Sequence, residues 1–110
     1  MAYVPGRGDA IWLNFTPQAG HEQAGHRPAL VLSPASYNRK AGLALLCPIT
    51  SRVKGYPFEV QLVGTTEVHG VVLADQVKSL DWRERDAEFI EKVPEALTRD
   101  VIAKVQALLG

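Results

Sequence analysis

Polar and hydrophobic residues alternate along several short stretches of this chain, which is the pattern of half-buried β-strands. Every second side chain is apolar in residues 9–15, DAIWLNF, and again in residues 58–63, FEVQLV. Side chains two positions apart in a strand point to the same face. The alternation therefore predicts an inward face made of Ile11, Leu13, Phe15, Phe58, Val60 and Leu62.

Other stretches are apolar almost without interruption. Residues 27–33, RPALVLS, and 43–50, LALLCPIT, are bounded by turn residues and predict strands buried on both faces. Residues 71–80 predict one or two short strands, and 87–93 a further one. The segments between them are loops at 16–26, 51–57 and 64–70, and a connection with one helical turn at 34–42. Short strands at such close spacing are typical of a small barrel or sandwich.

The end of the chain has a different period. Residues 94–110, PEALTRDVIAKVQALLG, start with a proline and a glutamate and stop at a glycine, which are helix-boundary signals. Apolar residues recur there at helical spacing, which predicts an amphipathic helix packed on the barrel. Its stripe consists of Leu97, Val101, Val105 and Leu108, widened by Ala96, Ile102 and Leu109.

Composition is that of an ordinary globular protein and predicts one domain over residues 1–110. The chain is 46% hydrophobic and 22% charged. Cys47 is the single cysteine, so no internal disulfide can form, and a reducing cytoplasm fits. The first ten residues lack the apolar core of a secretory signal, and no apolar run is long enough to cross a membrane. A cytoplasmic protein without a membrane partner is expected.

Charge is balanced overall but unevenly distributed. Residues 1–60 hold six basic and three acidic side chains, whereas residues 61–110 hold six basic and nine acidic ones. Between His21 and Phe58 the sequence holds five basic residues and one acidic residue, Glu22. This local basic region is compatible with an anion-binding surface, and equally with scattered solvated charges.

Several familiar motifs lack the context that would give them meaning. The tripeptide at Arg7–Asp9 fits a turn before the first strand better than an adhesion signal. The histidines of HEQAGH are five residues apart, whereas the zinc-protease motif needs four on a helix face. No GxSxG elbow is present, and no nucleophile stands beside a base. We expect no metal site and no cofactor.

The remaining chemistry lies at predicted strand ends. Arg27 opens one strand and Thr50 closes the next, so an antiparallel pair would make them neighbours on one rim of the barrel. A guanidinium, hydroxyls, further cations and aromatic rings suit a phosphodiester with flanking bases. The competing interpretation is an Arg27 ion pair with Glu22 or Asp75 and a Thr50 that only completes a strand end. The rim also contains Ser51, Arg52, Lys54, Tyr56 and Phe58.

At these residues the sequence resembles the MazF/PemK family of toxin endoribonucleases, most closely its MazF branch. Three segments carry the resemblance: GDAIWLNFTPQAGHEQAGHRPALVLSP, CPITSRVKGYPFEV and GVVLADQVKSLDWR. Together with the terminal helix they cover nearly the whole chain. The resemblance implies an SH3-like barrel with a C-terminal helix, usually a homodimer, and an acidic MazE-like antitoxin that blocks the rim.

The resemblance also implies an activity. Members of the family cut single-stranded RNA at short sequences without a metal, leaving a 2′,3′-cyclic phosphate and a 5′-hydroxyl. The functional arginine of the family falls on Arg27 and its threonine on Thr50, which we take as the catalytic pair. We expect RNA to be bound by His21, His26, Ser51, Arg52, Lys54, Tyr56 and Phe58.

Three points stay open from sequence alone. A guanidinium is a poor base at neutral pH, so His21 or His26 could share the proton transfer. The same barrel also carries gyrase poisons, which act through a tryptophan near the C-terminus; here the last tryptophan is Trp82. A non-catalytic SH3-like binding module would explain the fold but not the rim.

Overall fold

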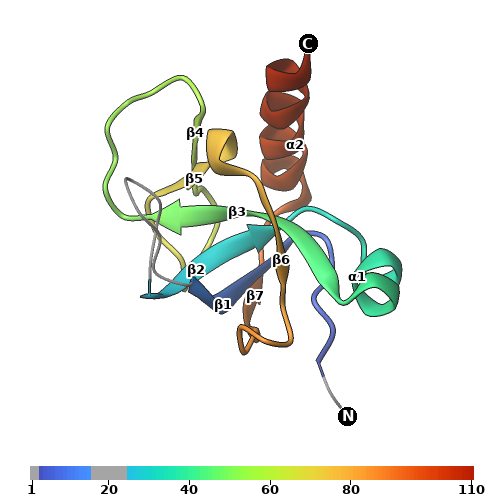
Figure 1. The fold of residues 1–110 in the computed structure, drawn as a ribbon. Coiled ribbons are helices and arrows are strands. Elements are labelled where there is room, and N and C mark those ends of the chain that lie inside the picture. The colour runs from blue at the N-terminus through green and yellow to red at the C-terminus, as the bar shows by residue number, and fades with distance from the viewer. Residues whose placement is uncertain (1–2, 16–24) are drawn as a thin grey trace.

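The computed structural model describes residues 3–15 and 25–110, and these form a curved antiparallel sheet with helices at its margins (Figure 1). The strands are β1 (Asp9–Phe15), β2 (Gly25–Val31), β3 (Leu43–Thr50), β4 (Glu59–Gln61), β5 (Val71–Leu73), β6 (Lys78–Asp81) and β7 (Glu88–Lys92). The helices are α1 (Ala35–Ala41), the 3₁₀ turn η1 (Ala74–Gln76) and α2 (Glu95–Leu109).

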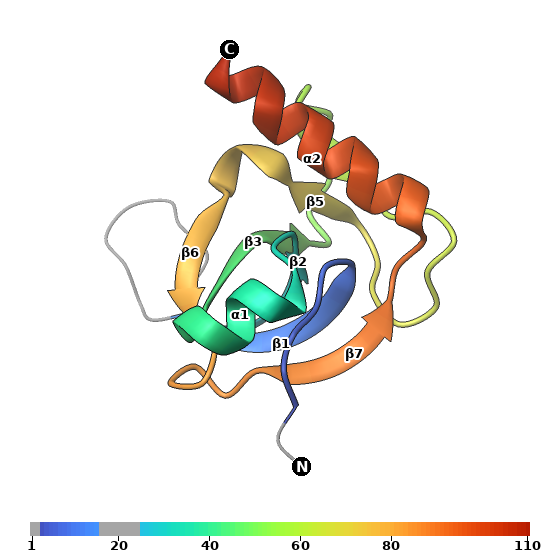
Figure 2. The ribbon, with the colours of Figure 1, turned by 90° about the vertical axis from the view of Figure 1, so that its right-hand side faces the viewer.

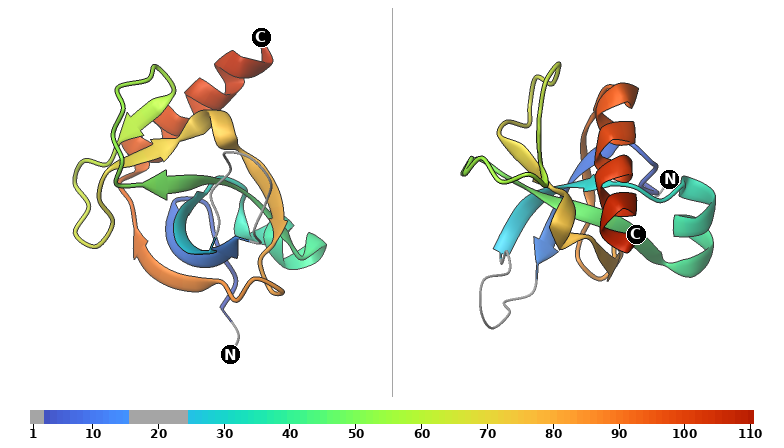
Figure 3. Two further views of the ribbon diagram at one scale, coloured as in Figure 1. Left: turned by 60° about the vertical axis from the view of Figure 1, so that its left-hand side comes forward. Right: turned by 90° about the horizontal axis from the view of Figure 1, so that it is seen from above.

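The strands pair in the order β4-β5-β3-β2-β1-β7, with β6 on the first half of β3. All of these pairings are antiparallel. Viewed along its axis, the sheet curls into a small barrel, with α2 lying across one side and α1 at one end (Figure 2). The left view of Figure 3 also looks into the curled sheet, and the right view shows it from above. The predicted small β-barrel with a C-terminal helix is confirmed.

Sequence periodicity located most elements closely. β1 and β3 have the predicted bounds, and α2 spans all but the ends of the predicted helix. Three predictions need correction. β2 begins at Gly25, so His26 belongs to a strand and not to the preceding loop. The connection at 34–42 contains a seven-residue helix, and β4 keeps only three residues of the predicted 58–63 strand.

Strands β1 to β3 bury side chains on both faces, and each face contributes to a separate hydrophobic cluster. Leu30 and Cys47 belong to the cluster under α2, whereas Val31 and Leu46 belong to the cluster covered by Trp82. This confirms the prediction from the continuous apolar runs. Leu97 and Val101 attach α2 to the first cluster, while Leu108 at its far end is 45% exposed. The helix therefore packs on the barrel mainly through its first half.

Helix α1 is held by one buried amide. Asn38 is fully buried; its Oδ1 accepts from Ser33 Oγ at 2.6 Å, and its Nδ2 donates to the Pro5 carbonyl at 2.8 Å. Its own carbonyl accepts from Trp82 Nε1 at 2.9 Å. Asn38 thus ties the N-terminal segment, α1 and the β6–β7 turn together.

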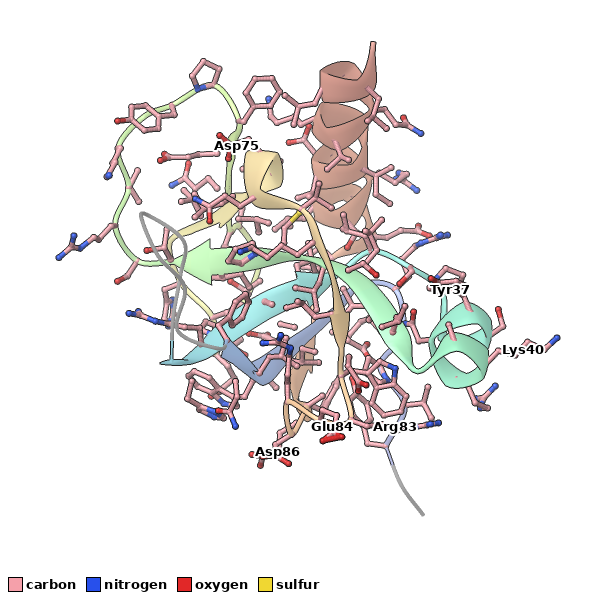
Figure 4. The ribbon with its side chains drawn as sticks, viewed as in Figure 1. Tyr37, Lys40, Asp75, Arg83, Glu84 and Asp86 are labelled. Atoms are coloured by element: carbon pink, nitrogen blue, oxygen red, sulfur yellow. The ribbon has the colours of Figure 1, made fainter. Side chains whose placement is uncertain are left out.

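Replacing Asn38 with alanine is expected to lower the free energy of unfolding by about 2–4 kcal/mol, since it leaves a cavity and unsatisfied buried partners. Urea unfolding measures the loss. Lys40→Ala on the same helix is the control, because Lys40 is exposed and points away from the barrel (Figure 4). A change for Asn38→Ala no larger than that of the control would contradict the assigned role.

Within residues 3–15 and 25–110, no helix combines the length and the apolar character needed to cross a bilayer.

Candidate active site

A pocket of about 480 Å³ opens where β3 ends. Its lining comes from the end of β3, the 51–58 loop, strands β4 and β5, and the turn η1. Cationic, aromatic and acidic side chains share its wall. The lining residues are Thr50, Arg52, Lys54, Tyr56, Phe58, Glu59, Leu73, Asp75 and Gln76.

Strand register relates Arg27 to Thr50. β2 and β3 pair antiparallel with Ala29 opposite Pro48 and Leu30 opposite Cys47. Extending this register by two residues would set Arg27 opposite Thr50, and directly opposed residues of antiparallel strands have side chains on the same face. In Figure 1 the start of β2 and the end of β3 lie on the same side of the molecule. The observed ladder ends at Ala29 and Pro48, so the pairing of Arg27 with Thr50 stays a prediction that this register favours.

Thr50 is held at the pocket by pairing on the β5 side as well. It is the last residue of β3 and lies opposite Val71 of β5. Its Oγ1 accepts a hydrogen bond from the Arg52 backbone N–H at 3.1 Å. The hydroxyl proton is not used by that bond, so the side chain can still donate to a ligand.

The 51–58 loop presents two cations and an aromatic ring. Arg52, Lys54 and Tyr56 are exposed, and the Lys54 ammonium lies 5.8 Å from the centre of the Tyr56 ring. Phe58 is partly buried against the core below, where it anchors the end of the loop. A cation beside an aromatic face is a suitable arrangement for a phosphate and the base that follows it.

Histidine 26 lies away from this pocket. Its Nδ1 is 2.9 Å from Asn14 Oδ1, and its ring stacks on Trp12 with a centroid distance of 5.1 Å. Because His26 and Arg27 are adjacent in a strand, their side chains point to opposite faces. His26 is therefore a poor candidate for proton transfer at Thr50. His21 falls outside the described residues.

The pocket brings together five of the predicted site residues, Thr50, Arg52, Lys54, Tyr56 and Phe58. Arg27 and Ser51 are exposed and do not line it. Sequence reasoning missed Glu59, Leu73 and Gln76 as pocket residues and considered Asp75 only as an ion-pair partner.

The sequence held a signal for two of these residues, Asp75 and Gln76. Asp75 and Gln76 come just after the short apolar stretch VVLA, in the same way that Thr50 ends an apolar stretch. Gln76 Oε1 is buried with no hydrogen-bond partner among the described residues. Asp75 belongs to η1 and lies on the side of that turn that faces the 51–58 loop (Figure 4). Glu59 and Asp75 offset the two cations, so the pocket is not uniformly basic.

No thiol nucleophile is available at this site. Cys47 is fully buried in β3, and burial, with a smaller contribution from the Asp75 carboxylate, raises the pKa of its thiol to about 12. The thiol therefore stays protonated at neutral pH, and a protonated thiol is a weak nucleophile. Across the part of the chain that the structure describes, no three acidic, histidine or cysteine side chains are grouped as metal ligands.

Comparison with known proteins identifies the family. The model of the PemK-like, MazF-like toxins of type II toxin–antitoxin systems matches residues 6–109. This chain belongs to that family. The endoribonuclease toxin MazF of Escherichia coli K12 is 53% identical over 108 residues, which are 98% of this chain and 96% of the relative.

Solved structures agree with this assignment. The crystal structure of MazF from Deinococcus radiodurans superposes on this toxin with a TM-score of 0.94, at 59% identity, covering 99% of both chains. A MazE–MazF structure from the same organism gives a TM-score of 0.89, also at 59% identity, over 99% of this chain and 98% of that one. The likeness extends over the whole barrel and α2.

Proposed function

We propose that this toxin is a metal-independent endoribonuclease, an mRNA interferase that cuts single-stranded RNA by attack of the adjacent 2′-hydroxyl. As a member of a toxin family with a 53% identical endoribonuclease relative, it is an RNA-cutting enzyme of the MazF type. The observation that carries the site assignment is the β2–β3 register, which supports Arg27 and Thr50 as neighbours beside a pocket containing two cations.

The reaction needs charge stabilisation more than any other contribution. As the 2′-oxygen loses its proton and bonds to phosphorus, the bond from phosphorus to the 5′-oxygen breaks and that oxygen takes up a proton. Negative charge builds on the two non-bridging oxygens during this exchange. Arg27 can bridge both oxygens with its planar guanidinium, and Thr50 Oγ1 can donate one further hydrogen bond. The products are a 2′,3′-cyclic phosphate and a 5′-hydroxyl.

RNA on either side of the cut is assigned to the 51–58 loop. Arg52 and Lys54 offer cations to flanking phosphates, and Ser51 offers a hydroxyl. Tyr56 offers an exposed ring on which a base can stack, with Phe58 supporting it from below. His21 and His26 remain candidate contacts to the more distant RNA, since neither is assigned to the Arg27–Thr50 pair.

The partners follow from the same family. The D. radiodurans relative has been crystallised with MazE, and a MazE-like antitoxin is the partner we propose for this toxin. An acidic antitoxin segment could pair with Arg52 and Lys54 and so compete with RNA. We further propose that residues 1–110 act as one toxin domain, in a homodimer, in the cytoplasm where messenger RNA is translated.

The two competing functions have less support. The comparisons give relatives that are endoribonucleases and no tryptophan stands near the end of α2, which disfavours a gyrase poison. A non-catalytic SH3-like binding module would not explain the placement of Arg27 and Thr50.

Substituting deoxyribose for the single ribose at the cleavage site is expected to abolish cutting, because the attacking 2′-hydroxyl is then missing. The assay is incubation with a long RNA in EDTA, mapping of the cut, and repetition with a short oligonucleotide that differs at that one sugar. The all-ribose oligonucleotide is the control. Cutting of the deoxy substrate at the full rate, or a strict need for magnesium, would refute the mechanism.

A further inference from the structure

Glu59, the first residue of β4, fastens the 51–58 loop to the barrel. Its Oε1 accepts hydrogen bonds from the backbone N–H groups of Lys54 and Gly55 at 3.2 and 2.9 Å, and its Oε2 lies 3.2 Å from the Lys54 nitrogen. The Glu59 N–H in turn donates to the Tyr56 carbonyl at 3.1 Å. One residue thus contacts three successive residues of the loop.

Without these contacts the loop has little to hold it. Residues 51–57 are all exposed and form neither helix nor strand. Their backbone N–H groups could equally well bind water, so the conformation depends on few bonds. Bonds from N–H groups to a carboxylate are about twice as strong as those between neutral groups. Two adjacent N–H groups directed at one anion also form a concave anion-binding turn, which Gly55 permits with φ +80°.

The barrel end of this connection is firm. Val60, the next residue, is 5% exposed in the core, and Glu59 itself lies opposite Leu73 in the β4–β5 ladder. The backbone of Glu59 is therefore fixed in the sheet, and its carboxylate binds the loop. The side chain also lines the pocket beside Thr50.

We propose that Glu59 is a positioning residue for RNA binding. By holding the backbone of Lys54 and Gly55, it sets the Lys54 ammonium and the Tyr56 ring, 5.8 Å apart, at the mouth of the pocket. This inference rests on the proposed function, because it assumes that RNA occupies that pocket. Glu59 contacts the backbone of the loop, and acts on RNA through Lys54.

Glu59→Ala is expected to weaken RNA binding about tenfold with little change in kcat. Without Glu59 the loop loses conformational entropy when RNA orders it, and this loss lowers the affinity. The RNA affinity of Glu59→Gln should lie between those of the unmodified toxin and Glu59→Ala, because its amide oxygen still accepts one hydrogen bond. The matched control is Glu84→Gln, which removes the same charge from an exposed turn at the other end of the molecule (Figure 4). Binding is measured with an RNA analogue carrying one deoxyribose at the cleavage site.

A double-mutant cycle separates positioning from a general loss of structure. In the unmodified toxin, Lys54→Ala should weaken binding and reduce the slope of log affinity against log salt by about one phosphate contact. In the Glu59→Ala background the same substitution should have little further effect, since Lys54 is no longer held in place. Equal effects of Lys54→Ala in both backgrounds, or unchanged binding by Glu59→Ala, would overturn the proposal.

Amide hydrogen exchange gives a readout independent of activity. Exchange at Lys54 and Gly55 should be slow in the unmodified toxin and fast in Glu59→Ala, with the β3 amides unaffected. If Glu59→Ala does not fold, the Gln variant is assessed in the same way. Failure of the unmodified toxin to cut RNA would refute the proposed function, whereas normal cutting with unprotected Lys54 and Gly55 amides would refute the role of Glu59 alone.

Discussion

Arg27→Ala is expected to reduce RNA cleavage by about 10²–10³-fold, the usual effect of deleting a donor to the charge that develops in a transition state. Arg27 is exposed at the start of β2, so truncating it leaves both hydrophobic clusters intact. Single-turnover cleavage of a defined RNA measures the loss. Thr50→Ala should be impaired as well, by a smaller factor, because it removes one neutral donor and not a charged pair of donors.

The control for this prediction is Arg39→Ala, which removes an exposed guanidinium from α1 at the other end of the barrel. It should cut RNA normally. Circular dichroism and thermal melting should give all three variants profiles close to that of the unmodified toxin. Normal cutting by Arg27→Ala would show that the catalytic assignment is wrong.

Gly70→Ala is expected to lower the free energy of unfolding by about 2–5 kcal/mol and to impair cleavage together with it. A Cβ added at Gly70 would lie 2.1 Å from the Thr50 carbonyl oxygen and 2.8 Å from Ser51 Cα. The residue also has φ +100°, a conformation that costs other L-residues energy. Relief of the clash requires the end of β3 to move, and Thr50 would move with it.

Gly55→Ala provides the comparison for stability. Gly55 also has a positive φ, of 80°, but an added Cβ there would meet nothing within 4 Å. It should therefore show the backbone strain alone, about 1–2 kcal/mol. Urea unfolding of both variants separates strain from clash. A Gly70→Ala protein as stable as Gly55→Ala would show that the end of β3 moves freely and that its close approach to Gly70 does not constrain it.

Elements whose signal lies within a few neighbouring residues were predictable from sequence. β1 alternates because one face is buried, and α2 repeats every three to four residues because one stripe contacts the barrel. Both were located closely. β4 was overestimated, since alternation at 58–63 continues beyond the three residues that find a partner in β5. The helix α1 was underestimated, because its stability depends on Asn38 bonding to groups as far away as Pro5 and Trp82.

The residues of the candidate site likewise include some that the sequence could identify and others that it could not. Arg27 and Thr50 could be named from sequence, because strand ends and a family motif mark them. The loop residues Arg52, Lys54, Tyr56 and Phe58 were named for their chemistry, and the structure groups all four at one pocket. The role of Glu59 was not predictable, since the backbone N–H groups that donate to its carboxylate are brought there by the way the 51–58 loop folds back. His26 was misplaced for a similar reason: its neighbours Trp12 and Asn14 come from another strand.

The sequence by itself determined the strand-rich fold, the terminal helix, the family and the residue types of the rim, because these depend on local periodicity and on motifs read along the chain. Only the tertiary structure decided which rim residues share a pocket, that His26 stacks on Trp12 beside Asn14, and that Glu59 contacts the loop backbone. The physical reason is that such relations depend on register and on contacts between segments distant in sequence. A one-residue change of register would reverse the faces, and no local pattern specifies it fully.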